Sequence, residues 1–170
     1  DGVVQSVAAT SLGEPLGYWW QMIPDARPRR ALLLGLGGGT VAQLLALRFG
    51  DVAMVGVDID QRVLDLAATT LLTNVSIDLV CADAHDFIAS TQLEFDYVCV
   101  DMFQGEQIDR RITSRPFLRA LTRITPRGGV IYFNLFQERR TQQSVNRIAR
   151  VLRVTDQLVC GRNVVVRART

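Results

Sequence analysis

Short apolar runs alternate with helix-compatible segments along most of this chain. The runs have the length of buried strands and cover residues 31–35, 53–57, 76–80, 96–100 and 129–134. The segments between and after them cover residues 39–48, 61–72, 85–90, 116–124 and 138–152. Strands that alternate with helices form a parallel sheet with helices on both faces. The pattern therefore predicts a doubly wound α/β fold.

The end of the chain changes this picture. Two further strand-like runs, 154–160 and 163–168, are separated only by Gly161 and Arg162. Parallel neighbours need a crossover of a dozen or more residues, so these two strands must form an antiparallel hairpin. We therefore expect a seven-stranded, mostly parallel sheet that ends in an antiparallel hairpin. Dinucleotide-binding Rossmann domains keep their strands parallel, whereas this arrangement is typical of class I S-adenosylmethionine-dependent transferases.

The first 30 residues lack this regular pattern. Val3–Val7 could form an edge strand, and Tyr18-Trp-Trp20 is an aromatic cluster that could be either an active-site lid or core packing. We expect two parts: an N-terminal remnant or lid segment, residues 1–30, and a nucleoside-cofactor-binding transferase domain, residues 31–170. The first residue is Asp1 rather than Met, which leaves open whether N-terminal residues have been removed.

A glycine-rich loop follows the first apolar run, in the sequence Gly35-Leu-Gly-Gly-Gly39. Glycine tolerates positive φ and lets a ligand approach the backbone, and the N–H groups that open the next helix point toward the same space. Asp58 ends the second run, where a carboxylate can accept hydrogen bonds from both ribose hydroxyls of a nucleotide. A dinucleotide fingerprint would need glycine at Thr40. The loop and the acid together predict a site for a nucleoside-containing cofactor.

Ligands of doubly wound sheets bind at the carboxyl ends of the strands. Asp58, Asp83 and Asp101 close three successive runs, and Asn134 lies at the end of the next one. Each acid alone is best explained as a turn or N-cap residue, but the set together with the glycine loop favours a site. The only histidine, His85, could be a general base, although a cap or helix-surface role is favoured.

Composition limits the setting of the protein. A chain of 170 residues has the size of one domain, and no run reaches the ~20 apolar residues that span a membrane. The cysteines Cys81, Cys99 and Cys160 lie in strand-like runs without metal-ligand spacing. We therefore expect reduced core cysteines, no metal, no membrane partner, no targeting segment and a cytoplasmic location.

Charge is strongly segregated along the chain. All 19 basic residues are arginines, which excludes a Schiff-base lysine. Residues 1–109 contain 5 arginines and 15 acids, a net charge of −10, whereas residues 110–170 contain 14 arginines and 2 acids, a net charge of +12. A basic half can hold an anion such as RNA. Because aromatic residues for base stacking are not interleaved, solvated faces or a dimer surface are favoured over nucleic acid.

Four motifs resemble, in order, those of the spermidine/spermine synthase family of polyamine aminopropyltransferases. They are Leu32–Thr40, Val57–Asp60, Ala82–Phe87 and Phe95–Asp101, and the resemblance extends from about residue 16 to the end. It implies decarboxylated S-adenosylmethionine as cofactor, methylthioadenosine as by-product, a small-molecule amine acceptor and a homodimer.

The resemblance also implies roles for individual residues. Asp101 would help to deprotonate and orient the attacking amine. The cofactor side would consist of Gly35, Gly37, Gly38 and Gly39 along the methionine moiety, Asp58 and Ile59 at the ribose, and Asp83 and Ala84 at the adenine. The acceptor side would consist of Tyr18, Gln21 and Gln104.

The chain departs from the family pattern on the acceptor side. Gln104 and Gln21 stand where the family has acids, and most of the family's N-terminal β-hairpin domain has no counterpart in this sequence. Two alternatives therefore remain open. One is a methyltransferase that uses S-adenosylmethionine on a small molecule or RNA, with Arg29 or Arg30 as partner for the cofactor carboxylate. The other is a non-catalytic nucleoside-binding module.

Overall fold

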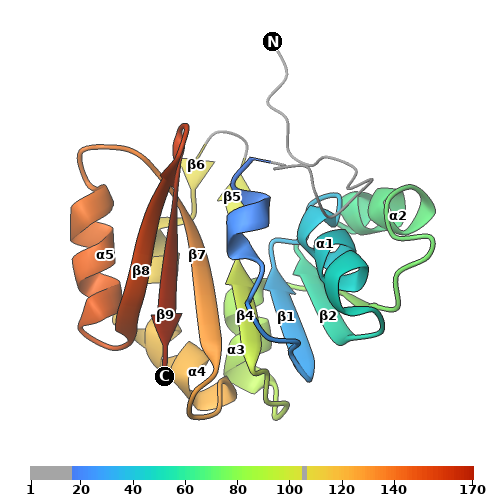
Figure 1. The fold of residues 1–170 in the computed structure, drawn as a ribbon, viewed down its shortest axis with the longest axis horizontal. Coiled ribbons are helices and arrows are strands. Elements are labelled where there is room, and N and C mark those ends of the chain that lie inside the picture. The colour runs from blue at the N-terminus through green and yellow to red at the C-terminus, as the bar shows by residue number, and fades with distance from the viewer. Residues whose placement is uncertain (1–16, 105–106) are drawn as a thin grey trace.

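A mixed seven-stranded sheet forms the centre of the molecule in the computed structural model, which describes residues 17–104 and 107–170 (Figure 1). The strand order is β3-β2-β1-β4-β7-β9-β8. The strands are β1 (Arg30–Leu34), β2 (Ala53–Asp58), β3 (Asp78–Cys81), β4 (Tyr97–Val100), β7 (Val130–Phe136), β8 (Arg153–Cys160) and β9 (Asn163–Arg169). The first five in this order pair in parallel, and β9 is antiparallel to both β7 and β8. The predicted doubly wound fold with its closing hairpin is confirmed.

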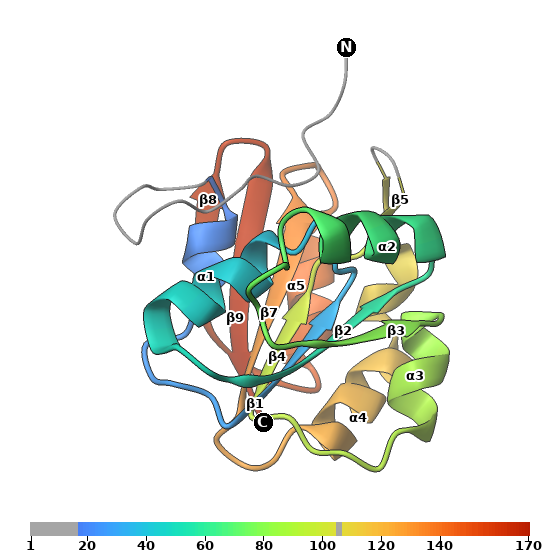
Figure 2. The same cartoon turned by 90° about the vertical axis from the view of Figure 1, so that its right-hand side faces the viewer.

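Helices cover both faces of the sheet, as Figure 2 shows. They are η1 (Trp19–Met22), α1 (Thr40–Phe49), α2 (Gln61–Thr69), α3 (Ala84–Ser90), η2 (Arg110–Thr113), α4 (Arg115–Ile124) and α5 (Thr141–Ala149). Strand β1 shows how alternation assigns side chains to the two cores. Leu32 and Leu34 pack with α3, α4 and α5, whereas Ala31 and Leu33 pack with η1, α1 and α2.

Side-chain caps set the starts of three helices. Asp60 accepts from the backbone N–H of Arg62 at α2, Asp83 from that of His85 at α3, and Ser114 from that of Phe117 at α4. A cap of this kind is worth about 1 kcal/mol because it satisfies a donor that the helix leaves unpaired. Asp60, Asp83 and Ser114 are therefore the N-cap residues of α2, α3 and α4.

The structure corrects several expected boundaries. Helix α2 ends at Thr69 rather than at residue 72, and α5 covers 141–149 rather than 138–152. A turn precedes α5, since the Thr141 hydroxyl accepts from the Glu138 N–H at 2.8 Å. The short antiparallel pair β5 (Phe103–Gln104) and β6 (Gln107–Ile108), and the helix η2 after it, were not predicted.

Other expectations have mixed outcomes. Cys99 is buried and Cys160 partly so, but Cys81 is exposed, so the prediction of a core position is wrong for Cys81. The expected edge strand at residues 3–7 lies outside the described residues. Within residues 17–104 and 107–170, no helix combines the length and apolar character that a membrane crossing requires.

Candidate active site

Asp101 lies directly after β4, where the chain leaves the carboxyl edge of the sheet. Its two carboxylate oxygens accept from different elements: Oδ1 from the Asn134 amide at 2.8 Å and Oδ2 from the Tyr18 hydroxyl at 3.3 Å. Asn134 comes from β7 and Tyr18 from the residue before η1. The carboxylate is therefore held in one orientation by a group from the sheet and a group from the segment that precedes β1.

The environment of Asp101 makes it basic for a carboxylate. Burial raises its pKa to about 6, although the hydrogen bonds from Asn134, Tyr18 and Trp19 oppose that rise. The pKa of Tyr18 is itself raised well above its usual value, by burial and by the neighbouring Asp101 charge. Tyr18 therefore remains a hydrogen-bond donor near neutral pH, whereas Asp101 can accept and release a proton there.

Asn163 controls the orientation of the Asn134 side chain. Its amide nitrogen donates to Asn134 Oδ1 at 2.9 Å, which leaves the Asn134 amide nitrogen directed at Asp101. The sequence analysis found Asn134 but missed Asn163. The antiparallel register that pairs Phe136 with Asn163 brings β9 to this edge, and that register could not be derived before the strand order was known.

The glycine loop and Asp58 form one unit beside this carboxylate. Asp58 Oδ2 accepts from the Gly37 N–H at 3.0 Å, and its Oδ1 accepts from the Asp60 N–H at 3.1 Å. Gly35 has a φ of +78°, and a Cβ there would lie 2.3 Å from the Asp101 carbonyl oxygen. The absence of a side chain at Gly35 thus allows the loop to pass directly over the end of β4.

A cavity of about 330 Å³ opens between the loop, Asp58 and Asp101, which we call the donor cavity. This volume is within the range of small-molecule sites, about 300–1,000 Å³. Tyr18 and Trp19 form part of its wall, so this part of the aromatic cluster lines the site, while Trp19 also belongs to the buried core. Three carboxylates, those of Asp58, Asp60 and Asp101, line the cavity, and its described lining includes no arginine.

A smaller recess of about 60 Å³ adjoins the donor cavity and shares Gly35, Asp58 and Ile59 with it. Asp83 and Ala84, the residues that the resemblance assigns to the adenine, line this recess together. Ile59, 62% exposed on its rim, offers an apolar surface for a flat ring.

Asp83 caps α3 and faces a charged neighbour that the sequence analysis did not single out. The Arg111 guanidinium lies 3.4 Å from Asp83 and 2.8 Å from Asp109. Burial would raise the pKa of Asp83, but the His85 N–H and the Arg111 charge outweigh it and lower the pKa. His85 itself contacts Asp109 at 3.1 Å and packs on Phe117, away from the donor cavity.

The structure does not bring every candidate residue to the donor cavity. Gln21 is exposed and lines a separate depression with Asp25 and Arg167. Gln104 lies in β5, but the structure does not describe its side chain. Arg29 and Arg30 lie at the opposite edge of the sheet, where their backbone N–H groups donate to Asp96.

Gly38 and Gly39 lie in the loop as expected, and Gly39 opens α1 with a φ of +90°. Its missing side chain makes room for Leu72, which a Cβ would approach to 2.6 Å. Among residues 17–104 and 107–170, no cluster of histidine, cysteine or acidic side chains has the make-up of a metal site.

Curated relatives match most of this chain but only part of their own length. The polyamine aminopropyltransferase of Neisseria meningitidis serogroup A is 26% identical over 136 residues, which cover 78% of this chain and 52% of the relative. That of Vibrio vulnificus is 30% identical over 117 residues, 66% of this chain and 39% of the relative. The chain thus spans about half, or less than half, of the length of the curated relatives that it matches. The resemblance to polyamine aminopropyltransferases is confirmed.

Solved structures share the fold. Human methyltransferase-like protein 13, in complex with SAH, superimposes with a TM-score of 0.75 at 19% identity, over 84% of this chain and 72% of that protein. Spermidine synthase from Thermotoga maritima gives a TM-score of 0.69 at 14% identity, over 89% of this chain and 58% of that protein. The family model described as "Methyltransferase domain" matches residues 31–129, more than half of the chain. The chain therefore belongs to the methyltransferase domain family.

Proposed function

We propose that this chain is the catalytic domain of a transferase that binds decarboxylated S-adenosylmethionine and transfers its aminopropyl group to an amine. The observation that carries the proposal is the charge of the donor cavity, whose described lining has the carboxylates of Asp58, Asp101 and Asp60 and no arginine; of these three, Asp60 is paired with Arg62, which lies outside the lining. S-adenosylmethionine has a carboxylate that this lining would repel. The decarboxylated form has an ammonium and a sulfonium, which the acids attract.

The two arginines that could have paired with a cofactor carboxylate support the same choice. Arg29 and Arg30 contact Asp96 at the amino edge of the sheet, whereas the glycine loop and Asp58 are at the carboxyl edge. Within this proposal, Asp58 binds the ribose, Asp83 and Ala84 bind the adenine, and the glycine loop lies along the side chain that carries the sulfonium.

The bound cofactor supplies a carbon activated by its sulfonium: the amine lone pair forms an N–C bond, the C–S bond breaks, and its electron pair stays on sulfur as methylthioadenosine leaves. Asp101 accepts the proton that the amine nitrogen loses. A carboxylate with a pKa of about 6 is ionised at pH 7 and can return this proton to water after each turnover. Asn134 and Tyr18 hold the Asp101 carboxylate in one orientation, so that it is placed to accept the proton in each turnover.

Methyl transfer from S-adenosylmethionine is the second candidate. The family match favours it, and so does Gln104, since an amide attracts a polyamine less than an acid would. In this case the carboxylate of S-adenosylmethionine would have to bind to backbone N–H groups of the glycine loop. The two candidates therefore differ in which form of the cofactor the donor cavity prefers.

Calorimetric titration with both forms of the cofactor and with methylthioadenosine distinguishes them. We expect the decarboxylated form to bind at least tenfold more tightly than S-adenosylmethionine, a difference of about 1.4 kcal/mol. Asp58→Asn should weaken all three ligands, because each has the ribose, whereas Asp65→Asn on the exposed side of α2 should weaken none. Tighter binding of S-adenosylmethionine would refute aminopropyl transfer and favour methyl transfer.

A further inference from the structure

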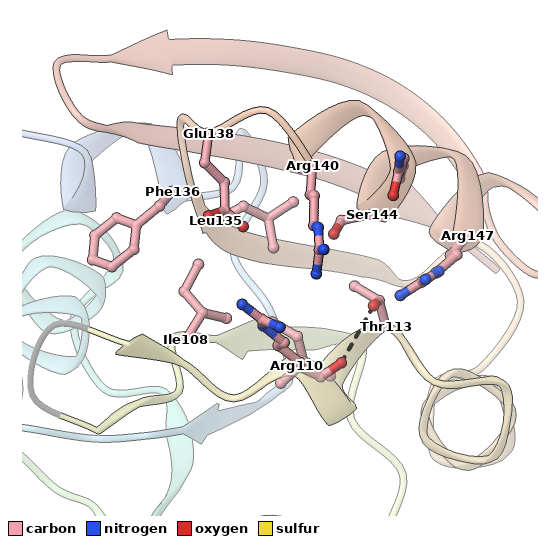
Figure 3. Close-up of a pocket in the computed structure, with 11 residues that line it drawn as sticks. Ile108, Arg110, Thr113, Leu135, Phe136, Glu138, Arg140, Ser144 and Arg147 are labelled. Carbon is pink, nitrogen blue, oxygen red and sulfur yellow. Dashed lines mark hydrogen bonds between the residues drawn. The ribbon is translucent and has the colours of Figure 1, made fainter.

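A second and larger cavity, of about 470 Å³, lies beside the donor cavity (Figure 3). It is bounded by η2, the end of β7 and α5, and we call it the arginine cavity. Phe136, near the end of β7, lines both cavities. The two cavities therefore meet at Phe136.

Three arginines from two parts of the chain line this cavity. Arg110 comes from η2, Arg140 immediately precedes α5, and Arg147 lies in the last turn of α5. Figure 3 shows all three side chains extending into the space between η2 and α5. Glu138 is the one carboxylate in the described lining, so the lining has an excess of two positive charges.

These arginines converge on one space without neutralising partners. Within residues 17–104 and 107–170, none of the three guanidinium groups forms an ion pair; the same holds for most arginines of the chain, but these three line a single cavity. Unneutralised guanidinium groups directed at one space repel each other, and an anion between them removes that repulsion. The site thus has the chemistry of a receptor for carboxylate or phosphate.

The rest of the lining suits a ligand with a short apolar segment. Figure 3 shows Ile108, Leu135 and Phe136 on one side of the cavity, and Phe136 also lines the donor cavity. Ser144 and Thr113 add hydroxyls on the side of the arginines, and the Thr113 hydroxyl also contacts the Arg110 carbonyl at 3.4 Å. The order of surfaces is therefore anion site, apolar wall, then Asp101.

We infer that the arginine cavity holds the acceptor, and that this acceptor is an amine with an anionic group, phosphate or carboxylate, at its far end. The inference rests on the proposed function, because it assigns the reactive amine to Asp101. A diamine would have to place its second ammonium among three guanidinium groups, and close pairs of like charge are unfavourable. A carboxylate or phosphate in the same place forms charge-assisted hydrogen bonds instead.

Three four-carbon amines that differ only at the far end test this inference. They are 4-aminobutyl phosphate, 4-aminobutanoate and putrescine, titrated by calorimetry into the chain saturated with methylthioadenosine. We expect at least one of the two anionic amines to bind tenfold or more tightly than putrescine. The relative affinities of the phosphate and the carboxylate then show which anion the site prefers.

Paired variants locate the binding. Arg140→Gln with Arg147→Gln should weaken the preferred anionic amine at least tenfold and leave the affinity for methylthioadenosine unchanged. Arg150→Gln is the control, since Arg150 is exposed just after α5 and does not line the cavity. With decarboxylated S-adenosylmethionine as donor, the same pair should raise KM for the anionic acceptor more than it lowers kcat.

The outcomes separate this inference from the proposed function. If methylthioadenosine binds but putrescine binds as tightly as the anionic amines, the anionic acceptor is wrong and the proposed function stands. An equal loss of affinity in Arg150→Gln would also overturn the inference of an anionic acceptor. The loss would then come from the lower net positive charge of the protein and not from the arginines that line the cavity. If the anionic amines bind through Arg140 and Arg147 but methylthioadenosine does not bind, the proposed function fails, and the acceptor role of the cavity fails with it.

Discussion

At the scale of single residues, the site depends on a carboxylate whose proton affinity is adjusted from several sides. Burial raises the pKa of Asp101, and the donors Asn134 and Tyr18 lower it, so that the result is about 6. Either influence alone would give a poorer base: an exposed carboxylate accepts a proton weakly, and a buried one without donors would stay protonated.

Removing one hydrogen-bond donor to Asp101 should therefore shift the pH dependence of turnover. Tyr18→Phe deletes the hydroxyl bond to Asp101, and we expect the acid limb of the kcat/KM profile to move to higher pH. Asp101→Asn should abolish that limb and lower kcat/KM by about 100-fold or more, the usual contribution of a general base. Tyr132→Phe, at a tyrosine on β7 outside the donor cavity, is the matched control and should leave the limb in place.

At the scale of elements, the turn from β1 into α1 sets how closely the loop approaches β4. Gly35 donates to the Val57 carbonyl at 2.9 Å, and its missing side chain leaves space for the Asp101 carbonyl. The loop therefore has two functions: it is part of the proposed cofactor site, and it covers the end of β4 at the carboxyl edge of the sheet.

Gly35→Ala should disrupt both functions. It combines a positive φ with a contact of 2.3 Å, so we expect a loss of unfolding free energy above the ~1 kcal/mol of conformational strain alone. Gly128→Ala is the control, because Gly128 has a φ of +87° but nothing within 4 Å of the added Cβ. Chemical denaturation of both variants measures the difference. Equal losses of unfolding free energy in the two variants would mean that the contact between the added Cβ and the Asp101 carbonyl does not destabilise the fold.

Strand order explains what the sequence could and could not predict. The apolar runs, the closing hairpin and the acids Asp58, Asp83 and Asp101 are local features, and each was found from the sequence. Asn163 in the donor cavity and Arg111 in the adjoining recess are near the site only through long-range packing, which a local pattern does not encode. Gln21 shows the opposite case, because Tyr18 and Trp19 reach the site while the Gln21 side chain is exposed at a separate depression.

At the scale of the whole molecule, the segregation of charge along the sequence becomes segregation in space. The strand order places β3, β2 and β1 on one side of β4, and β7, β9 and β8 on the other (Figure 1). The acidic residues 1–109 contribute the first group and the arginine-rich residues 110–170 the second. The carboxyl edge therefore has an acidic donor cavity beside a basic one.

The buried carboxylate also affects global stability. Because its pKa is raised in the folded state, the native protein binds a proton between about pH 4 and pH 6 that the unfolded chain does not, so this contribution to stability falls as pH rises through that window. Asp101→Asn should be more stable than the unmodified chain at pH 7, by up to about 3 kcal/mol. Thermal unfolding from pH 3.5 to 7.5 should show the difference vanish at the acid end. A variant less stable at pH 7 would contradict this.

The segment after β4 gives the fold a replaceable module. Phe103 lines the donor cavity, and Ile108, Arg110 and Thr113 line the arginine cavity, all within one stretch of chain. The Asp109 N–H donates to the Met102 carbonyl at 3.2 Å, next to the paired strands β5 and β6. An exchange of residues 103–113 between relatives would keep the glycine loop, Asp58 and Asp101 in place. Because Asp109 and Arg111 also line the recess at Asp83, a graft would have to retain these two residues to change the proposed acceptor site and leave the proposed donor site unaltered.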